Sequence, residues 1–222
     1  NTKNTVLMKK SLQEFYEKKN EEHGLSGKGC AWDNEKACAT RYEIACSMLE
    51  QAEMTIAEFG AGNGVNSFYF YAFNKNRYIG IEPLPFFYEW LETRLGHYDA
   101  CKVVNESIQS FAQKWKNVYG FSRDYQFDYA ACIGVYYLKL DADPEEYYQE
   151  ALESIKNMLE MSKVGLIFNG FQDCVDFKDD DQFYFNMPRL LADIYKMGYS
   201  RMELISRPDL NRYEFFLKIL KK

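Results

Sequence analysis

Short apolar runs alternate with stretches of helical periodicity along most of the chain. The apolar runs predict strands over residues 54–60, 77–83, 101–107, 127–134 and 163–171. Apolar positions at helical spacing predict helices over residues 65–74, 87–95, 108–115, 144–161 and 188–198. The last two apolar runs, 200–207 and 212–220, flank the turn sequence PDLN and predict a hairpin. Strands that alternate with helices indicate a parallel sheet covered on both faces, and the hairpin adds one antiparallel strand.

Two helices are expected before the first strand. Residues 6–19 form an amphipathic pattern, which the glycines of HGLSGKG bring to an end. A second helix is expected from an N-cap at Asp33 to about Gln51, because Cys38, Tyr42, Ala45 and Leu49 form an apolar stripe. We therefore divide the chain into an N-terminal helical extension, residues 1–50, and one globular unit, residues 51–222.

Composition narrows the class of protein. The chain has 222 residues, of which 47% are hydrophobic, and this suits one packed core. A formal net charge of −6 gives no basic field, so neither nucleic acid nor a membrane is expected as a partner. No apolar run approaches the roughly 18 residues of a membrane span, and the charged N-terminus lacks the apolar segment of a signal peptide. The six cysteines contain no C-x-x-C pair, which indicates free thiols and a cytoplasmic location.

Residues 57–65, AEFGAGNGV, hold three glycines within five positions at the end of the first predicted strand. In an open α/β sheet, ligands bind beyond the carboxyl ends of the strands, so this turn suits a cofactor. A dinucleotide fingerprint needs G-x-G-x-x-G, but Val65 stands at the place of the third glycine. The G-K-[ST] of a phosphate-binding P-loop is missing too. The motif that stands here is Glu58-x-Gly60-x-Gly62-x-Gly64.

This motif resembles the first motif, [DE]-x-G-x-G-x-G, of the class I S-adenosylmethionine (SAM)-dependent methyltransferases. The resemblance implies a three-layer α/β/α sandwich with a seven-stranded, mostly parallel sheet in the order 3-2-1-4-5-7-6, strand 7 antiparallel. It implies SAM as cofactor and S-adenosylhomocysteine (SAH) as product. Glu58 would attract the ammonium of SAM, while backbone N–H groups of the turn receive its carboxylate. The residues that approach SAM in the turn would be Gly60, Ala61, Gly62 and Gly64.

Further cofactor residues follow from the ends of the next strands. Glu82, with Pro83 after it, can accept both ribose hydroxyl protons, although a dinucleotide enzyme would also place an acid here. The resemblance places the adenine near Glu106, Ser107 and Ile108, and SAM beside Cys132 and Ile133.

The segment before the glycine turn also resembles the lead-in of many small bacterial methyltransferases, which carry a Trp and then an "RF"-like pair on a helix. Here these are Trp32 and Arg41-Tyr42. The resemblance implies that Arg41 pairs with the SAM carboxylate and that Trp32 helps to close the site. Alternatively, Arg41 is a solvated charge on the helix and Trp32 packs in the core.

The acceptor side is harder to define from the sequence. Candidate catalytic residues are Tyr136 and Tyr137, which would face the acceptor or pack in the core, and His23, a general base or an exposed helix-end histidine. Residues 20–34 and the long connection 171–188 are expected to form the acceptor pocket, with candidate contacts at Asn169, Phe171, Tyr184 and Asn186. The acidic run 173–181 is a lid, a cation site or a solvated loop; as a wall, it would favour a neutral or cationic acceptor. No metal site is expected.

These observations predict a SAM-dependent methyltransferase that acts on a small molecule, at oxygen. DNA amino-methyltransferases carry an Asn- or Asp-Pro-Pro-aromatic tetrapeptide after the fourth strand, where this chain has Gly134-Val135-Tyr136-Tyr137. A loose resemblance to methyltransferases of bacterial surface-polysaccharide clusters points to a sugar or a phosphoryl substituent as acceptor. An NAD(P)-linked oxidoreductase and a non-catalytic SAM-binding partner subunit are the alternatives. Monomer and homodimer both remain open.

Overall fold

The computed structural model describes residues 10–49, 53–65, 67, 77–119, 126–207, 210 and 213–221. The helix expected over 65–74 lies almost wholly outside the described residues. Most of the PDLN turn, 208–211, lies outside them too. Among the described residues, no helix is both long enough and apolar enough to cross a membrane.

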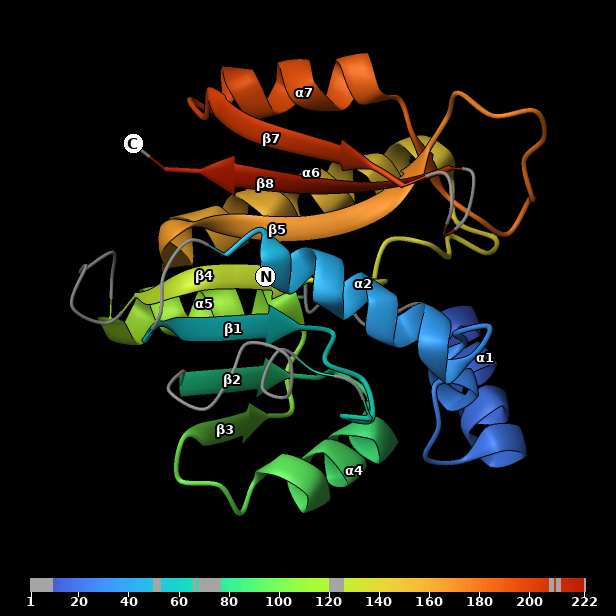
Figure 1. Cartoon of the computed structure of the whole chain (residues 1–222), viewed down its shortest axis with the longest axis vertical. Coiled ribbons are helices and arrows are strands. Elements are labelled where there is room, and N and C mark those ends of the chain that lie inside the picture. The colour runs from blue at the N-terminus through green and yellow to red at the C-terminus, as the bar shows by residue number, and fades with distance from the viewer. Residues whose placement is uncertain are drawn as a thin grey trace, which may run out of the picture.

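A single mixed sheet forms the centre of the molecule (Figure 1). Its strands are β1 (Thr55–Phe59), β2 (Arg77–Ile81), β3 (Cys101–Val104), β4 (Phe127–Cys132), β5 (Ser162–Gln172), β6 (Tyr184–Phe185), β7 (Arg201–Ser206) and β8 (Glu214–Leu220). The order is β3-β2-β1-β4-β5-β8-β7, and β8 is antiparallel to both of its neighbours. The expected order and the antiparallel last strand are therefore confirmed. The short strand β6 pairs with β5 beside this path and was not expected, since it is only two residues long.

Helices cover both faces of the sheet. They are α1 (Lys10–His23), α2 (Glu35–Ser47), α4 (Pro85–Leu95), α5 (Ile108–Tyr119), α6 (Pro144–Met161) and α7 (Met187–Lys196), with a 3-10 turn η1 (Lys28–Cys30). Apolar side chains of α5, α6 and α7 pack in one buried cluster, and those of α2 and α4 pack in another. Since successive strand residues point to opposite faces, Ala130 belongs to the first cluster and Ala131 to the second. Helix α1 stands apart from both layers, beside the carboxyl ends of the central strands (Figure 1).

Some boundaries differ from those expected, for local reasons. Helix α2 begins after Asn34 rather than Asp33, because the Asn34 side chain accepts a hydrogen bond from the Ala37 N–H at 2.9 Å. Helix α1 extends to His23 and ends at Gly24, whose φ of 57° is left-handed. Strand β3 ends at Val104, so Glu106 and Ser107 lie beyond the strand, at the start of α5.

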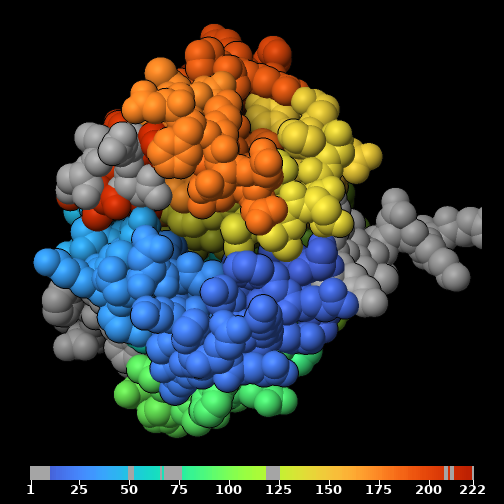
Figure 2. Space-filling view, turned by 90° about the vertical axis from the view of Figure 1, so that its right-hand side faces the viewer, coloured from blue at the N-terminus to red at the C-terminus, as the bar shows by residue number. Residues whose placement is uncertain are grey.

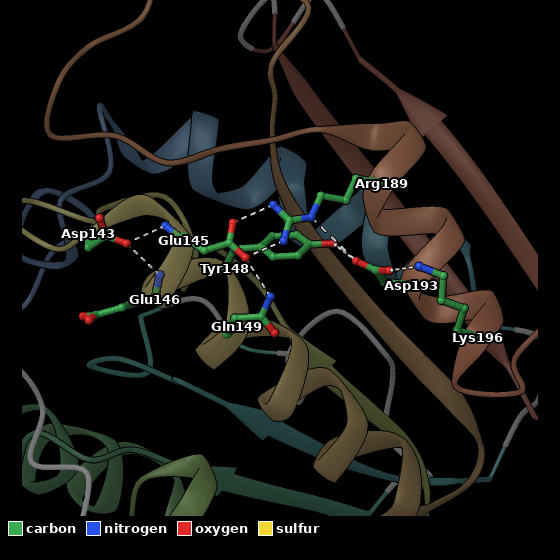
Figure 3. Close-up of polar contacts among 8 residues, drawn as sticks. All are labelled: Asp143, Glu145, Glu146, Tyr148, Gln149, Arg189, Asp193 and Lys196. Atoms are coloured by element: carbon green, nitrogen blue, oxygen red, sulfur yellow. Dashed lines mark hydrogen bonds and ion pairs between the residues drawn. The ribbon is translucent and has the colours of Figure 1, made fainter.

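A set of charged and aromatic side chains, which we call the α6–α7 network, joins these two helices (Figure 3). Arg189 donates to the Glu145 carboxylate at 2.7 Å, and its guanidinium lies 4.0 Å from the centre of the Tyr148 ring. The Tyr148 hydroxyl in turn donates to Asp193 at 2.8 Å. The network attaches α7 to α6 at the outer surface of the sandwich.

Candidate functional site

All three glycines of the turn after β1 adopt left-handed conformations. The φ angles of Gly60, Gly62 and Gly64 are 74°, 61° and 71°. A Cβ atom at Gly60 would come within 2.4 Å of Val135, and one at Gly64 within 2.8 Å of Leu91. Glycine is required at these positions because of both the backbone angle and the close approach of neighbouring side chains.

Glu82 follows β2 and faces this turn. Its carboxylate accepts hydrogen bonds from the N–H of Gly62 at 2.8 Å and from the N–H of Leu84 at 2.9 Å. Burial raises the pKa of Glu82 to about 7, although the two backbone N–H groups act in the opposite direction. The glycine turn and the predicted ribose acid are therefore in direct contact.

Three adjoining cavities lie at the carboxyl ends of the strands. The turn cavity, about 120 Å³, is bounded by Gly60–Asn63 and Glu82. The α5 cavity, about 150 Å³, is bounded by the start of α5. The outer cavity, about 490 Å³, is bounded by residues of α1 and of segment 28–33.

The three cavities share wall residues. Leu12, Gly60, Pro83 and Val135 line both the turn cavity and the α5 cavity. A second set, which we call the border, lines both the turn cavity and the outer cavity: Tyr16, Cys30, Trp32 and Gly134. Figure 2 looks onto this face of the molecule, where the α1 and α2 region covers the middle. Leu138 lines both the α5 cavity and the outer cavity, so each of the three cavities adjoins the other two.

The α5 cavity contains the residues expected near the adenine. Glu106, Ser107 and Ile108 all line it. The Ser107 hydroxyl accepts the N–H of Ser110 at 3.1 Å, and Glu106 binds Lys114, so both side chains also hold the first turn of α5. Tyr136 lines this cavity rather than the outer one, and its ring packs edge-on against Phe168 and Phe185. The structure thus places Tyr136 in the core beside the α5 cavity.

One face of α1 contributes to all three cavities. Leu12, Tyr16, Lys19 and His23 follow helical spacing and therefore lie along one side of the helix. Leu12 lines the turn and α5 cavities, Tyr16 belongs to the border, and Lys19 and His23 line the outer cavity. The sequence analysis assigned no site residue to this helix except His23, because no local motif shows which face of an amphipathic helix meets a ligand.

A group of buried polar side chains, which we call the buried cluster, lies beside the outer cavity. Arg41 binds the Glu214 carboxylate through two nitrogens, at 2.8 and 2.7 Å. Glu214 also accepts from the Tyr137 hydroxyl and, at 2.9 Å, from the Asn169 amide. Burial raises the pKa of the Tyr137 phenol, and the nearby Glu214 carboxylate raises it further. Tyr137 therefore keeps its proton and donates it in a hydrogen bond.

Two predicted residues, Arg41 and Asn169, belong to the buried cluster, and their contacts differ from those expected. The resemblance implies that Arg41 pairs with the SAM carboxylate, but its guanidinium is held by Glu214 and lines the outer cavity instead of the turn cavity. Asn169, expected as an acceptor contact, is fully buried; its side-chain oxygen accepts the Gly134 N–H at 2.7 Å. Glu214 was not predicted, although an acid within the apolar run EFFLKIL is itself a signal.

Three predicted cofactor residues line none of the three cavities: Glu58, Gly64 and Cys132. The open side of Gly64 faces Leu91 instead. Glu58 is fully buried, and its carboxylate accepts hydrogen bonds from Tyr42 and Tyr78, both at 2.6 Å. It lines none of the three cavities. Cys132 belongs to the apolar core, where burial raises the pKa of its thiol. Ile133, the next residue, does line the turn cavity.

The long connection 171–188 contributes less to the cavities than expected. Phe171 and Gln182 line the outer cavity, whereas the acidic residues of 173–181 do not. Tyr184 donates to Gln182 at 2.8 Å and lines none of the cavities. Asn186 is exposed and caps α7, where it accepts the Arg189 N–H at 3.0 Å. The described residues include no group of three or more His, Cys, Asp or Glu side chains arranged to hold a metal ion.

Four further residues of the site were not predicted individually. Asn63 lines the turn cavity, and its amide donates to the carbonyl of Ser26 at 2.9 Å, which joins the glycine turn to the loop after α1. Cys30, Gly134 and Val135 line the same cavity. Gly134 has a φ of 79°, and a Cβ there would come within 2.5 Å of the Trp32 ring. These contacts join distant segments, so spacing along the sequence does not show them.

No protein-family model and no curated protein sequence matches the chain. Its structure is similar to magnesium protoporphyrin IX methyltransferase from Synechocystis PCC 6803 with bound SAH, with 11% identity, 84% of each chain covered and a TM-score of 0.59. It is also similar to the N-methyltransferase NodS from Bradyrhizobium japonicum in complex with SAH. There the identity is 14%, the match covers 94% of this chain and 97% of that chain, and the TM-score is 0.59. The chain therefore has the class I SAM-dependent methyltransferase fold.

Proposed function

We propose that the protein is a SAM-dependent methyltransferase whose acceptor is a small molecule. The observation that carries this proposal is the contact between Glu82 and the left-handed glycine turn, at the point where two adjoining cavities meet. Several proteins of the same fold contain SAM or SAH. An oxidoreductase that binds NAD(P) would need the third glycine of its fingerprint, where this chain has Val65.

The ribose, the adenine and the methionine portion of the cofactor bind to different residues of the site. Glu82 and Pro83 receive the ribose, since a carboxylate can accept from both of its hydroxyl groups. Glu106, Ser107 and Ile108 surround the adenine in the α5 cavity, and the turn cavity, with Trp32 and Ile133 in its wall, takes the methionine portion. In this arrangement Glu58 supports the turn from beneath through Tyr42 and Tyr78.

The acceptor occupies the outer cavity, so transfer takes place at the border. When bound, the cofactor would supply an activated sulfonium methyl, which an acceptor oxygen would receive in line as SAH leaves. Gly134 and Trp32 bring the two cavities together there. His23 lines the outer cavity, but it lies two turns of α1 beyond Tyr16 of the border, so we do not assign it the removal of a proton from the acceptor. Tyr137, whose proton is held by Glu214, positions the acceptor and does not act as a base.

This proposal treats residues 1–50 as a cap on the SAM-binding unit, residues 51–222. Segment 28–33 and α1 supply much of the outer cavity wall, which supports that division. One protein of similar structure is named for magnesium protoporphyrin IX and another as an N-methyltransferase, so the choice of a sugar or phosphoryl acceptor rests on the sequence resemblance alone.

Calorimetry with SAM, SAH and NADH tests the cofactor. We expect heat from SAM and SAH and none from NADH. Gly62→Val should abolish the signal, because its Cβ would lie 3.0 Å from the Cys30 sulfur and the new side chain would occupy the turn cavity. Gly198→Val is the matched control, since Gly198 also has positive φ, at 95°, but no neighbour within 4 Å of its Cβ. Binding of NADH without SAM, or unchanged SAM affinity in Gly62→Val, would overturn the proposal.

The pH dependence of cofactor binding tests Glu82. Its raised pKa means that its contribution to folding stability is fully present below the ordinary carboxyl pKa and is lost as pH rises through about 7. Ribose hydroxyls bind the ionised form, so SAH affinity should rise as pH increases through about 7. Calorimetric titrations across this range should show the rise in the natural protein and a flat profile in Glu82→Gln. A flat profile in both would show that Glu82 does not bind the ribose.

A further inference from the structure

The outer cavity has a composition that indicates what binds there. We infer that the acceptor is a flat, unsaturated small molecule with an anionic group, a carboxylate or a phosphate, at the end remote from the atom that is methylated. This inference rests on the proposed function, because it takes the outer cavity as the acceptor site.

Aromatic rings form the walls of the outer cavity. They come from three parts of the chain: Phe15 and Tyr16 of α1, Trp32 after η1, and the pair Tyr137 and Phe171. The Tyr137 and Phe171 rings are stacked 4.2 Å apart at 14°, and Trp32 meets Tyr137 edge-on at 5.9 Å. Flat rings held in this way favour a flat ligand, because the ligand can stack or pack edge-on without moving them.

Such walls could also form a cage for a cationic ligand, but protein cations already lie over two of the rings. The Arg41 guanidinium lies 5.0 Å from the centre of the Trp32 ring. The Lys19 ammonium lies 5.9 Å from the centre of the Phe15 ring. A cationic acceptor would be repelled by these groups and would have to displace them.

The charges of the lining favour an anion. Lys19, Lys28 and Arg41 line the cavity, against one carboxylate, that of Asp33. Glu214 already balances Arg41. Within the described residues, no carboxylate forms an ion pair with Lys19 or Lys28. These two lysines are therefore free to bind an anionic ligand, in a protein whose net charge is −6.

The same face of α1 places the anion away from the reacting atom. The face is apolar at Leu12, has Tyr16 at the border and becomes basic at Lys19 and His23. With a rise of about 1.5 Å per residue, Lys19 lies about 4.5 Å and His23 about 10.5 Å beyond Tyr16 along the helix axis. That separation matches the span of a ring system between a methyl-accepting atom and its anionic group.

Matched probes test the charge and the flatness separately. Calorimetry of the SAH-saturated protein would use naphthoate, naphthyl phosphate, naphthamide, naphthylmethylammonium and decahydronaphthoate. Naphthoate should bind about tenfold more tightly than naphthamide and naphthylmethylammonium, as expected for charge-assisted contacts with two partly exposed lysines. It should also bind more tightly than the puckered decahydronaphthoate. Naphthyl phosphate distinguishes the two anionic groups. If it binds more tightly than naphthoate, the acceptor carries a phosphate; if naphthoate binds more tightly, the acceptor carries a carboxylate.

Two double variants show whether Lys19 and Lys28 are responsible. Lys19→Gln/Lys28→Gln should remove the tenfold preference for naphthoate and leave SAH affinity unchanged. Lys18→Gln/Lys36→Gln makes the same charge change at exposed lysines outside the cavities and should keep the preference. Equal affinity for naphthoate and naphthamide, tighter binding of the cation, or a preference that survives in the first variant would overturn the inference. Absence of SAH heat in the natural protein would instead overturn the proposed function.

Discussion

Arg41 and Arg189 each bind a carboxylate and lie over an aromatic ring, but in opposite surroundings. The Arg41 side chain is 5% exposed and its partner Glu214 is 0% exposed, whereas Arg189 and Glu145 are 42% and 57% exposed. Each set also includes a tyrosine that donates to a carboxylate, Tyr137 in the buried cluster and Tyr148 in the α6–α7 network. Water surrounds the exposed pair of Arg189 and Glu145, whereas the pair of Arg41 and Glu214 is almost completely buried. The α6–α7 network therefore attaches α7 to α6, while the buried cluster fixes part of the wall of the outer cavity.

Removing the buried carboxylate should have the largest effect. Glu214→Ala leaves Arg41 buried without its counter-ion, which costs about 3–5 kcal/mol of unfolding free energy. The matched change Glu145→Ala exposes Arg189 to water and should cost far less. Urea unfolding of both variants measures the difference. Equal losses would show that the burial of Arg41 does not set its dependence on Glu214.

Removing the hydroxyl of Tyr137 or of Tyr148 compares the buried cluster and the α6–α7 network at the level of one hydroxyl group. Tyr137→Phe leaves the Glu214 carboxylate and the Asn169 amide each short of a buried partner, so we expect a loss of about 1–3 kcal/mol. Tyr148→Phe removes one hydrogen bond to Asp193, whose other oxygen already accepts from Lys196, and should cost only about 0.5–1.5 kcal/mol. Both changes keep the ring, so urea unfolding reports the hydroxyl alone. The comparison fails if Tyr148→Phe is the more damaging variant.

Acid should weaken the pair of Arg189 and Glu145, and alkali should weaken the hydrogen bond from Tyr137 to Glu214. Hydrogen bonding from Arg189 lowers the pKa of Glu145 to about 2, so its contribution to stability is present above the ordinary carboxyl pKa and is lost as pH falls towards 2. The pKa of Tyr137 is raised, so its contribution is full below the ordinary phenol pKa and is lost in alkali. Unfolding midpoints measured against pH should have a shallower acid slope in Arg189→Gln and a shallower alkaline slope in Tyr137→Phe. No change of slope in either variant would contradict these assignments.

Salt should produce the smallest effect. Counter-ions screen exposed charges over about 3 Å at 1 M ionic strength but reach buried pairs poorly. The difference in melting temperature between the natural protein and Arg189→Gln should therefore shrink on adding sodium chloride. The difference for Glu214→Ala should stay the same, and a similar decrease there would mean that water and ions enter the buried cluster.

Local motifs predicted the fold and the glycine turn because their signals depend on neighbouring residues. The strand order and the places of Gly60, Gly62 and Glu82 all follow from short segments of sequence. Asn186 was predicted as a ligand contact but caps α7, and its position before Met187-Pro188 carried the signal of a helix start. A careful reading of such local rules would have assigned it correctly.

Contacts between distant segments could not be predicted in this way. Glu58 matches the first motif, yet its carboxylate meets two tyrosines, because a buried acid needs donors wherever the sheet provides them. Val135 lies against the turn only because β4 is the neighbour of β1. The basic end of the α1 face, at Lys19, lines a cavity only because the loop after α1 is fixed to the turn through Asn63.

The pair of Arg41 and Glu214 joins positions 173 residues apart in the chain. Every residue that lines the turn cavity has been synthesised by Val135, whereas Glu214 belongs to β8, which is synthesised later. That strand must also enter between β5 and β7, which precede it in the chain. Long-range closure of this kind is slow, because the entropy of a large loop is lost before its contacts form. A growing chain therefore acquires the elements of its turn cavity well before it can complete the wall of its outer cavity.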